Sequence, residues 1–189
     1  MLFVMMFVSI LTVIFKQDFA LLKYAIVIFL VDIATRVFVS PRFAPTLILG
    51  RLVVHNQTPE YVGAQQKKFA WYIGLVLALT MLVLQVLVNS YSPITGLICF
   101  ICLIFLFFES AFSICLGCKF YSMVYKEKAQ YCPGEVCEVK DRQAIQKTSF
   151  SQWLVVVAFV VFIVLLVILT KDFMNVPPFD LFGLEDAAK

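Results

Sequence analysis

The stretch WLVVVAFVVFIVLLVILT, Trp153–Thr170, contains 18 consecutive residues without a charge. About 20 apolar residues of α-helix cross the hydrocarbon core of a bilayer, so a run of this length is a candidate transmembrane helix. Lys147 and Lys171 bound the run on its two sides. We therefore interpret the stretch as a membrane-spanning helix with basic flanks.

The composition of the whole chain agrees with a membrane environment. Of its 189 residues, 62% are hydrophobic and 14% are charged, whereas an average soluble domain has about 25% charged residues. A soluble domain of this size leaves much of its surface exposed and cannot hide so many apolar side chains in one core. The net charge of +3 is small, and nothing in the sequence suggests a nucleic-acid surface. We expect the lipid bilayer to be the main partner of the chain.

Four further apolar runs accompany the first one: Met1–Phe15, Phe19–Phe38, Phe69–Val88 and Ile94–Cys118. Lipid offers the backbone no hydrogen-bond partners, so single runs of this length must be helices. The N-terminal run has no basic segment ahead of it and no small-residue cleavage site behind it, and we interpret it as a retained span. The sequence predicts an all-α fold, a polytopic transmembrane helical bundle with about five spans.

The segments outside the spans are short. PRFAPTLILGRLVV, Pro41–Val54, is apolar with an arginine near each end and is too short to span a bilayer. We expect it to form an amphipathic helix at the membrane interface. The tail after Lys171 contains Pro177-Pro178 and several aromatic residues, and we expect an extended segment on the membrane surface.

Lysine and arginine are distributed unevenly between the two ends of the predicted spans. Eleven of the fifteen lie at the end of the second span or in the connections after the second and fourth spans: Arg36, Arg42, Arg51, Lys67, Lys68, Lys119, Lys126, Lys128, Lys140, Arg142 and Lys147. The other four are Lys16, Lys23, Lys171 and Lys189. Positively charged connections stay in the cytoplasm. We therefore expect the N-terminus and both long connections in the cytoplasm and the C-terminus outside.

Three ionisable residues lie within the predicted spans and are candidate site residues. Asp32 and Arg36 are four residues apart on one helix face, where they can neutralise each other. They mark either a functional site or a structural pair that locks the second helix against a neighbour. Glu109 lies among apolar residues, where a carboxylate favours its neutral form. It is a candidate for proton handling, for pairing with Arg36 or for a hydrogen bond to Ser113.

The six cysteines form three local pairs. Cys99 and Cys102 lie early in the fourth span among apolar residues, and we interpret them as packing residues. Cys115 and Cys118 lie near the end of the same run. Their spacing puts both sulfur atoms on one helix face, close enough for a disulfide or for two bonds to a metal.

The third pair, Cys132 and Cys137, flanks a Pro-Gly turn on the membrane side that we assign to the cytoplasm. A thiol–disulfide or sulfur relay would use Cys115 and Cys118 as the reactive couple and the third pair as the exchanging pair. Its partner would be a thioredoxin-like or sulfurtransferase protein. Alternatively, the four cysteines bind zinc as a tetrathiolate and pin the loop of a non-enzymatic membrane subunit. Packing without chemistry is the third interpretation.

Four motifs resemble the bacterial membrane family known as domain of unknown function 4395. They are VDIATRVF, SPRFAPTLILGRLV, QQKKFAWYIGLVLAL and, as the most specific, ESAFSICLGCKFY. The resemblance covers Met1 to Tyr125 and implies a four-span bundle in the bacterial inner membrane, with a link to thiol or sulfur chemistry. It carries over Cys115 and Cys118 as family positions. Glu109 departs from the family pattern, where a small or amide side chain is expected.

This resemblance gives the domain organisation. Residues 1–125 form a four-span family-like domain, residues 126–152 a cysteine-containing cytoplasmic loop, and residues 153–189 a fifth span with a short tail. A further interpretation is a carrier for a small sulfur species or ion that uses Asp32, Arg36 and Glu109. A bundle of five spans is small for a transporter unless it forms an oligomer.

Overall fold

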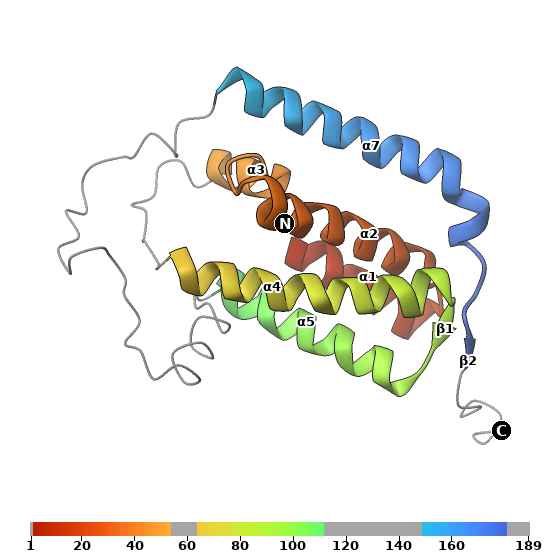
Figure 1. Cartoon of the computed structure of the whole chain (residues 1–189). Coiled ribbons are helices and arrows are strands. Elements are labelled where there is room, and N and C mark those ends of the chain that lie inside the picture. Colours follow the sequence, from red (N-terminus) through yellow and green to blue (C-terminus); the bar gives the residue numbers. More distant parts are fainter. Residues whose placement is uncertain (1, 54–63, 112–148, 181–189) are drawn as a thin grey trace.

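The computed structural model describes residues 2–53, 64–111 and 149–180, and these residues are mostly helical (Figure 1). The first three helices are α1 (Leu2–Lys16), α2 (Ala20–Ala34) and the short α3 (Pro45–Val53). The other three are α4 (Ala64–Met81), α5 (Pro93–Ala111) and α7 (Phe150–Met174). Two of them end in π-helical turns, α2 in η1 (Thr35–Val39) and α4 in η2 (Leu82–Leu87).

Four helices, α1, α2, α4 and α5, pack side by side as a bundle. The helix α7 runs along one side of this bundle against α2 and α3, and α3 lies at the end where α7 begins. We call this end the α3 end, and the opposite end, where α7 finishes, the tail end. Each predicted apolar run therefore contains a helix, although the last seven residues of Ile94–Cys118 lie outside the described residues.

The interior of the bundle is apolar. One buried cluster joins α1, α2, α4 and α5, and Cys99 and Cys102 lie in it beside Met6, Ile26 and Met81. Both thiols are free and buried. The prediction that these two cysteines are packing residues is confirmed, because apolar side chains surround them on the inner face of α5.

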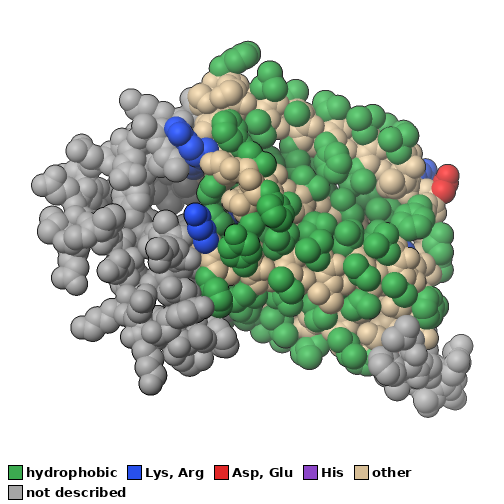
Figure 2. Space-filling view, in the orientation of Figure 1, with side chains coloured by type: hydrophobic (Ala, Val, Ile, Leu, Met, Phe, Trp, Pro, Cys, Tyr) green, Lys and Arg blue, Asp and Glu red, His purple; other side chains and the backbone are tan. Residues whose placement is uncertain are grey.

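Charged residues in the described helices lie only near the helix ends, while the middle of each helix has none. Figure 2 shows hydrophobic side chains over most of the visible face, with lysine or arginine side chains at both ends and an acidic side chain at the tail end. On α7, Ile168 and Leu169 are 67% and 78% exposed. Contiguous exposed apolar surface of this kind marks contact with a membrane or a partner rather than with water.

Two described helices are long and apolar enough to cross a membrane, Lys68–Leu87 and Phe150–Met174. The helices Leu2–Lys16 and Pro93–Glu109 are apolar but shorter. The predicted count of about five spans therefore stays a prediction. The prediction of a mainly helical fold is confirmed for the described residues.

The tail departs from the sequence prediction in two respects. The helix α7 continues past Lys171 to Met174, where the prediction is an extended segment. A short strand pairing then follows. Phe179–Asp180 (β2) forms a two-residue parallel ladder with Ser90–Tyr91 (β1), the segment between η2 and α5. The residues Asn175–Asp180, which we call the strap, thus cross the tail end of the bundle. The helical patterns do not predict this pairing, because two strands of two residues have no periodicity of their own.

Side chains from the bundle hold the strap in place. Lys23 is 1% exposed and donates a hydrogen bond of 2.6 Å from Nζ to the carbonyl oxygen of Val176. The Asn89 side chain donates from Nδ2 to the carbonyl oxygen of Pro177 at 3.1 Å. The backbone carbonyl oxygen of Asn89 accepts from the Phe179 amide at 3.0 Å. These contacts attach the end of α7 to the bundle.

Replacing Lys23 with methionine should loosen the strap, because methionine keeps the apolar length of the side chain and removes the donor. A hydrogen bond to a charged group contributes about 1.5–3 kcal/mol, so amide exchange at Phe179 should become about tenfold faster or more. The measurement is hydrogen exchange on the full chain in detergent. Lys16→Met, at an exposed lysine of the same end, is the control and should leave exchange unchanged. Equal rates in Lys23→Met and wild type would contradict the role of Lys23.

Candidate functional site

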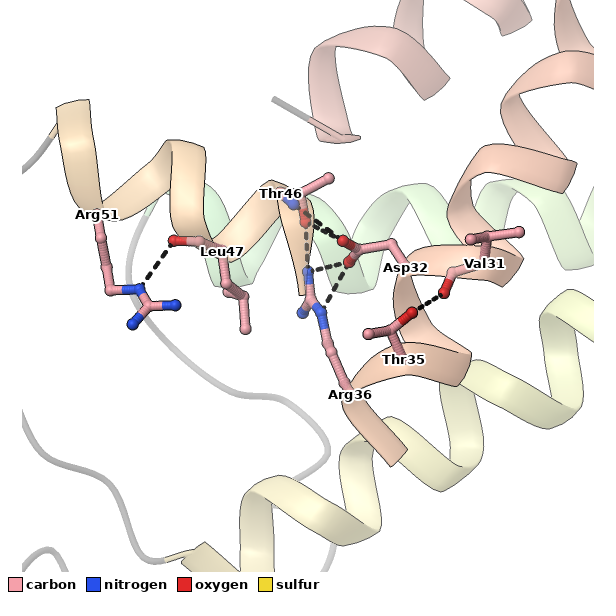
Figure 3. Close-up of polar contacts among 7 residues, drawn as sticks. All are labelled: Val31, Asp32, Thr35, Arg36, Thr46, Leu47 and Arg51. Atoms are coloured by element: carbon pink, nitrogen blue, oxygen red, sulfur yellow. Dashed lines mark hydrogen bonds and ion pairs between the residues drawn. The ribbon is translucent and has the colours of Figure 1, made fainter. Parts of the chain in front are cut away.

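The most connected polar site in the described residues surrounds Asp32, at the α3 end (Figure 3). Asp32 lies in the last turn of α2 and is fully buried. Its Oδ1 accepts a hydrogen bond from the Thr46 backbone amide at 3.0 Å and another from the Thr46 hydroxyl at 2.7 Å. Since Thr46 is the second residue of α3, Asp32 caps the N-terminus of a helix other than its own.

This cap explains how α3 begins. Pro45 occupies the first helical position, where a missing N–H group costs nothing. Ala44 precedes it and accepts the first helical hydrogen bond from the Ile48 amide at 3.0 Å. Alanine has no side-chain oxygen to cap the next amide, so the Asp32 carboxylate does this from α2. Its negative charge also lies at the positive end of the α3 dipole.

Arg36 completes the site from η1. Its Nε and Nη2 contact Asp32 Oδ2 at 2.8 Å and 2.6 Å, and Nη2 also donates to the Thr46 hydroxyl oxygen at 2.9 Å. The side chain is 8% exposed, so both charges of the pair are largely withdrawn from solvent. The predicted pairing of Asp32 with Arg36 is therefore observed, and the pair joins α2, η1 and α3.

The arrangement limits what Asp32 can do chemically. A carboxylate has about four lone-pair positions for hydrogen bonds. Thr46 occupies two at Oδ1 and Arg36 occupies two at Oδ2. A proton or a ligand would have to displace one of these donors, which favours the structural alternative, a pair that locks the second helix against its neighbour.

The third ionisable residue of the predicted set is not part of this site. Glu109 is exposed near the end of α5, and the structure pairs Arg36 with Asp32 rather than with Glu109. The expectation of a Glu109–Arg36 pair is therefore wrong, because Asp32 is available on the same helix turn as Arg36. Ser113, the other predicted partner of Glu109, lies outside the described residues.

A second polar contact at the α3 end centres on the carbonyl oxygen of Arg42, in the turn before α3. This oxygen accepts from Arg51 Nη2 at 3.0 Å and from Gln152 Nε2 at 3.2 Å. The amide oxygen of Gln152 in turn accepts from the Ser149 backbone amide at 3.1 Å, which forms the capping box of α7. Gln152 thus both caps α7 and attaches it to the α3 turn. The predicted span begins at Trp153 and does not include this site, although the Ser-x-x-Gln spacing is its local signal.

The four cysteines predicted to be reactive or zinc-binding, Cys115, Cys118, Cys132 and Cys137, lie outside the described residues. Their redox and zinc assignments stay predictions. In the part of the chain that the structure describes, no group of three or more histidine, cysteine or acidic side chains could hold a metal ion.

The fold and the site define a helical bundle with an uncharged middle, charges at its two ends and a buried ion pair that fixes a short helix at one end. The chain belongs to the family described as Domain of unknown function (DUF4395), whose sequence model matches residues 1–126. This match confirms the family that the motifs predicted. It includes α1 to α5 and leaves α7 and the strap outside. Comparison with curated proteins and with solved structures gave no significant match.

Replacing Asp32 with alanine should destabilise the bundle by about 3–5 kcal/mol, because it leaves the Arg36 guanidinium buried without a counter-charge. Adding Arg36→Met removes the stranded charge and should recover part of this loss. The remaining cost, about 1–3 kcal/mol, reflects the uncapped Thr46 amide. The measurement is the free energy of unfolding of the full chain in detergent micelles.

Asp172→Ala, at an exposed carboxylate on α7, is the control for this series and should change the unfolding free energy by less than about 0.5 kcal/mol. If the double variant were no more stable than Asp32→Ala alone, the buried charge of Arg36 would not be the cause of the loss.

Proposed function

We propose that this chain is a multi-pass protein of the bacterial inner membrane that carries a thiol relay at its cytoplasmic face. In this proposal α1, α2 with η1, α4 with η2, α5 and α7 cross the membrane, and α3 lies at the interface. The uncharged middle of each described helix supports this placement, as does the exposed apolar surface of α7.

The distribution of charge supports the orientation. The lysine and arginine residues in the described segments of the α3 end are Arg36, Arg42, Arg51, Lys67 and Lys68. The connections that leave this end, residues 54–63 and 112–148, carry six more. Since positively charged connections stay inside the cell, the α3 end faces the cytoplasm, and the strap lies on the opposite side.

The observation that carries the relay proposal is that the C-terminal end of α5 lies at the α3 end of the bundle. This helix runs from the tail end to the α3 end and is described as far as Ala111. Cys115 follows four residues later, so its Cα lies within about 14 Å of that of Ala111 even if the chain between them is fully extended. The proposal therefore places Cys115, the first cysteine of the Cys-Leu-Gly-Cys motif, near the basic end.

The proposed reaction is disulfide exchange between two cysteine pairs. A thiolate of the Cys132–Cys137 pair attacks the Cys115–Cys118 disulfide and forms a mixed disulfide. The second thiolate of the attacking pair then displaces the bound cysteine. Two electrons and two protons pass from one pair to the other, and a thioredoxin-like partner with its own dithiol reduces the Cys132–Cys137 disulfide that results.

Charge at the α3 end supports such chemistry. The C-terminal end of a helix carries a negative partial charge, which disfavours a thiolate just beyond α5. A thiolate is stabilised by nearby cationic side chains. Arg42 and Arg51 lie at the same end of the bundle and raise the electrostatic potential there.

The relay can be tested by differential alkylation of the full chain in sealed vesicles of both orientations, with an impermeant maleimide, before and after reduction. We expect Cys115 and Cys118 to react from the cytoplasmic side after reduction only. The buried Cys99 and Cys102 should react only after denaturation, so they serve as an internal control. In the variant with both Cys115→Ser and Cys118→Ser, Cys132 and Cys137 should become more reduced, because the disulfide that oxidises them is missing.

Replacement of Cys99 and Cys102 by serine is the matched control and should leave that oxidation state unchanged. The relay proposal fails if the variant without Cys115 and Cys118 labels at the third pair as wild type does. About one zinc per chain, released when Cys132 is replaced, would instead identify a zinc-pinned loop.

A further inference from the structure

Buried polar atoms without a hydrogen-bond partner gather at the tail end of the bundle. In the residues that the structure describes, three buried side-chain atoms have no such partner: Tyr24 Oη, Gln85 Oε1 and Asn89 Oδ1. Tyr24 lies near the start of α2, Gln85 lies within η2, and Asn89 follows η2 by two residues. Folded proteins pair nearly all of their buried polar groups, so three unpaired atoms at one end need an explanation.

Lys23 adds a positive charge at the same end. The residue is 1% exposed, and its Nζ bonds the Val176 carbonyl oxygen at 2.6 Å. An ammonium group has three N–H donors, and this is the one hydrogen bond of Nζ within the described ranges, where Lys23 also forms no ion pair. The carboxylates of Asp18 and Asp172 are exposed at this end, and Asp18 accepts from the Ala20 amide at 2.9 Å instead. A buried ammonium without a counter-charge is destabilising unless another group neutralises it.

These four side chains come from neighbouring elements at one level of the bundle. The helix α2 starts at the tail end, η2 finishes there, and the two pack against each other (Figure 1). Gln85, on η2, is 1% exposed. Lys23 and Asn89 bind consecutive carbonyl groups of the strap, which belong to residues whose Cα atoms are about 3.8 Å apart. A π-helical turn such as η2 is frequent at functional sites.

The chemistry of these groups defines the ligand that satisfies all of them. Lys23 has unused donors and a positive charge, so it requires an acceptor that carries a negative charge. The unpaired oxygens of Gln85 and Asn89 only accept hydrogen bonds, so they require a donor, whereas the Tyr24 hydroxyl can donate or accept. A monovalent oxyanion that also carries a hydroxyl group, such as hydrogen carbonate, supplies the charge, the acceptors and the donor in one molecule.

We propose that these four side chains, which we call the tail-end site, bind a small monovalent oxyanion with a hydroxyl group beneath the strap. The ammonium group donates to an ionised oxygen of the ligand, and the ligand hydroxyl donates to an amide oxygen. The ligand enters when the strap lifts, and its binding keeps the strap closed. The proposal requires neither the membrane placement nor the thiol relay proposed above, so it succeeds or fails separately from both.

The test uses hydrogen carbonate as the probe and amide exchange at Phe179 as the readout, on the full chain in detergent at constant pH. The Phe179 amide bonds the Asn89 carbonyl oxygen, so its exchange reports opening of the strap. We expect hydrogen carbonate to slow this exchange in a saturable manner, about tenfold when its concentration is ten times its Kd. Nitrate is the matched control, because it has the same charge and a similar planar shape but no proton to donate. At equal ionic strength it should leave exchange unchanged.

Two conservative variants locate the binding. Tyr24→Phe removes one hydroxyl and Gln85→Leu removes one amide, and each should weaken hydrogen carbonate binding about fivefold through the loss of one hydrogen bond. The ratio of exchange rates with and without hydrogen carbonate is measured in each variant, so a change in the strap itself divides out. Tyr91→Phe, at an exposed tyrosine of the same end, is the control and should keep the wild-type ratio.

Three results would overturn the assignment. If neither anion changes exchange at Phe179, the tail-end site binds no anion and water satisfies its unpaired groups. If nitrate slows exchange as much as hydrogen carbonate does, the ligand hydroxyl plays no part and the proposed ligand class is wrong. If Tyr24→Phe and Gln85→Leu both keep the wild-type ratio, hydrogen carbonate binds elsewhere on the chain.

Discussion

The contact on which the described structure depends is the one between the Asp32 carboxylate and the start of α3. An apolar bundle leaves a helix N-terminus and a guanidinium group without water to satisfy them, and each would cost several kcal/mol unpaired. Asp32 meets both needs, because one oxygen caps Thr46 and the other neutralises Arg36. This contact sets the angle between α2 and α3, and it thereby positions the turn at Arg42 to which α7 attaches.

The helix α7 lies outside the part of the chain that matches the family. At both of its ends it is attached by side chains that donate hydrogen bonds to backbone carbonyl oxygens. Gln152 bonds the carbonyl oxygen of Arg42 at one end, and Lys23 and Asn89 bond strap carbonyls at the other. An apolar helix gains little from packing on an apolar bundle when lipid is the alternative neighbour. Polar contacts to backbone carbonyls at the two ends therefore do most to fix where α7 lies.

Much of the fold could be predicted from local patterns, and the rest depended on distant contacts. Long apolar runs predicted the helices, and the spacing of Asp32 and Arg36 predicted their pairing, since both properties belong to a few turns of one helix. The capping box of Ser149 and Gln152 is also local and would have started α7 at Phe150 instead of Trp153. That α3 places Thr46 over Asp32 has no local signal. The strap is equally hidden, because it joins segments nearly ninety residues apart.

The same constraints locate any chemistry at the ends of the bundle rather than inside it. Cys99 and Cys102 lie among apolar side chains, and the oxygens of Asp32 are fully occupied. Cys115 follows Ala111, the last described residue of α5, by four residues. In the relay that we propose, the carbonyl end of α5 would disfavour a thiolate at this position, so the reaction would need cationic side chains nearby to stabilise it.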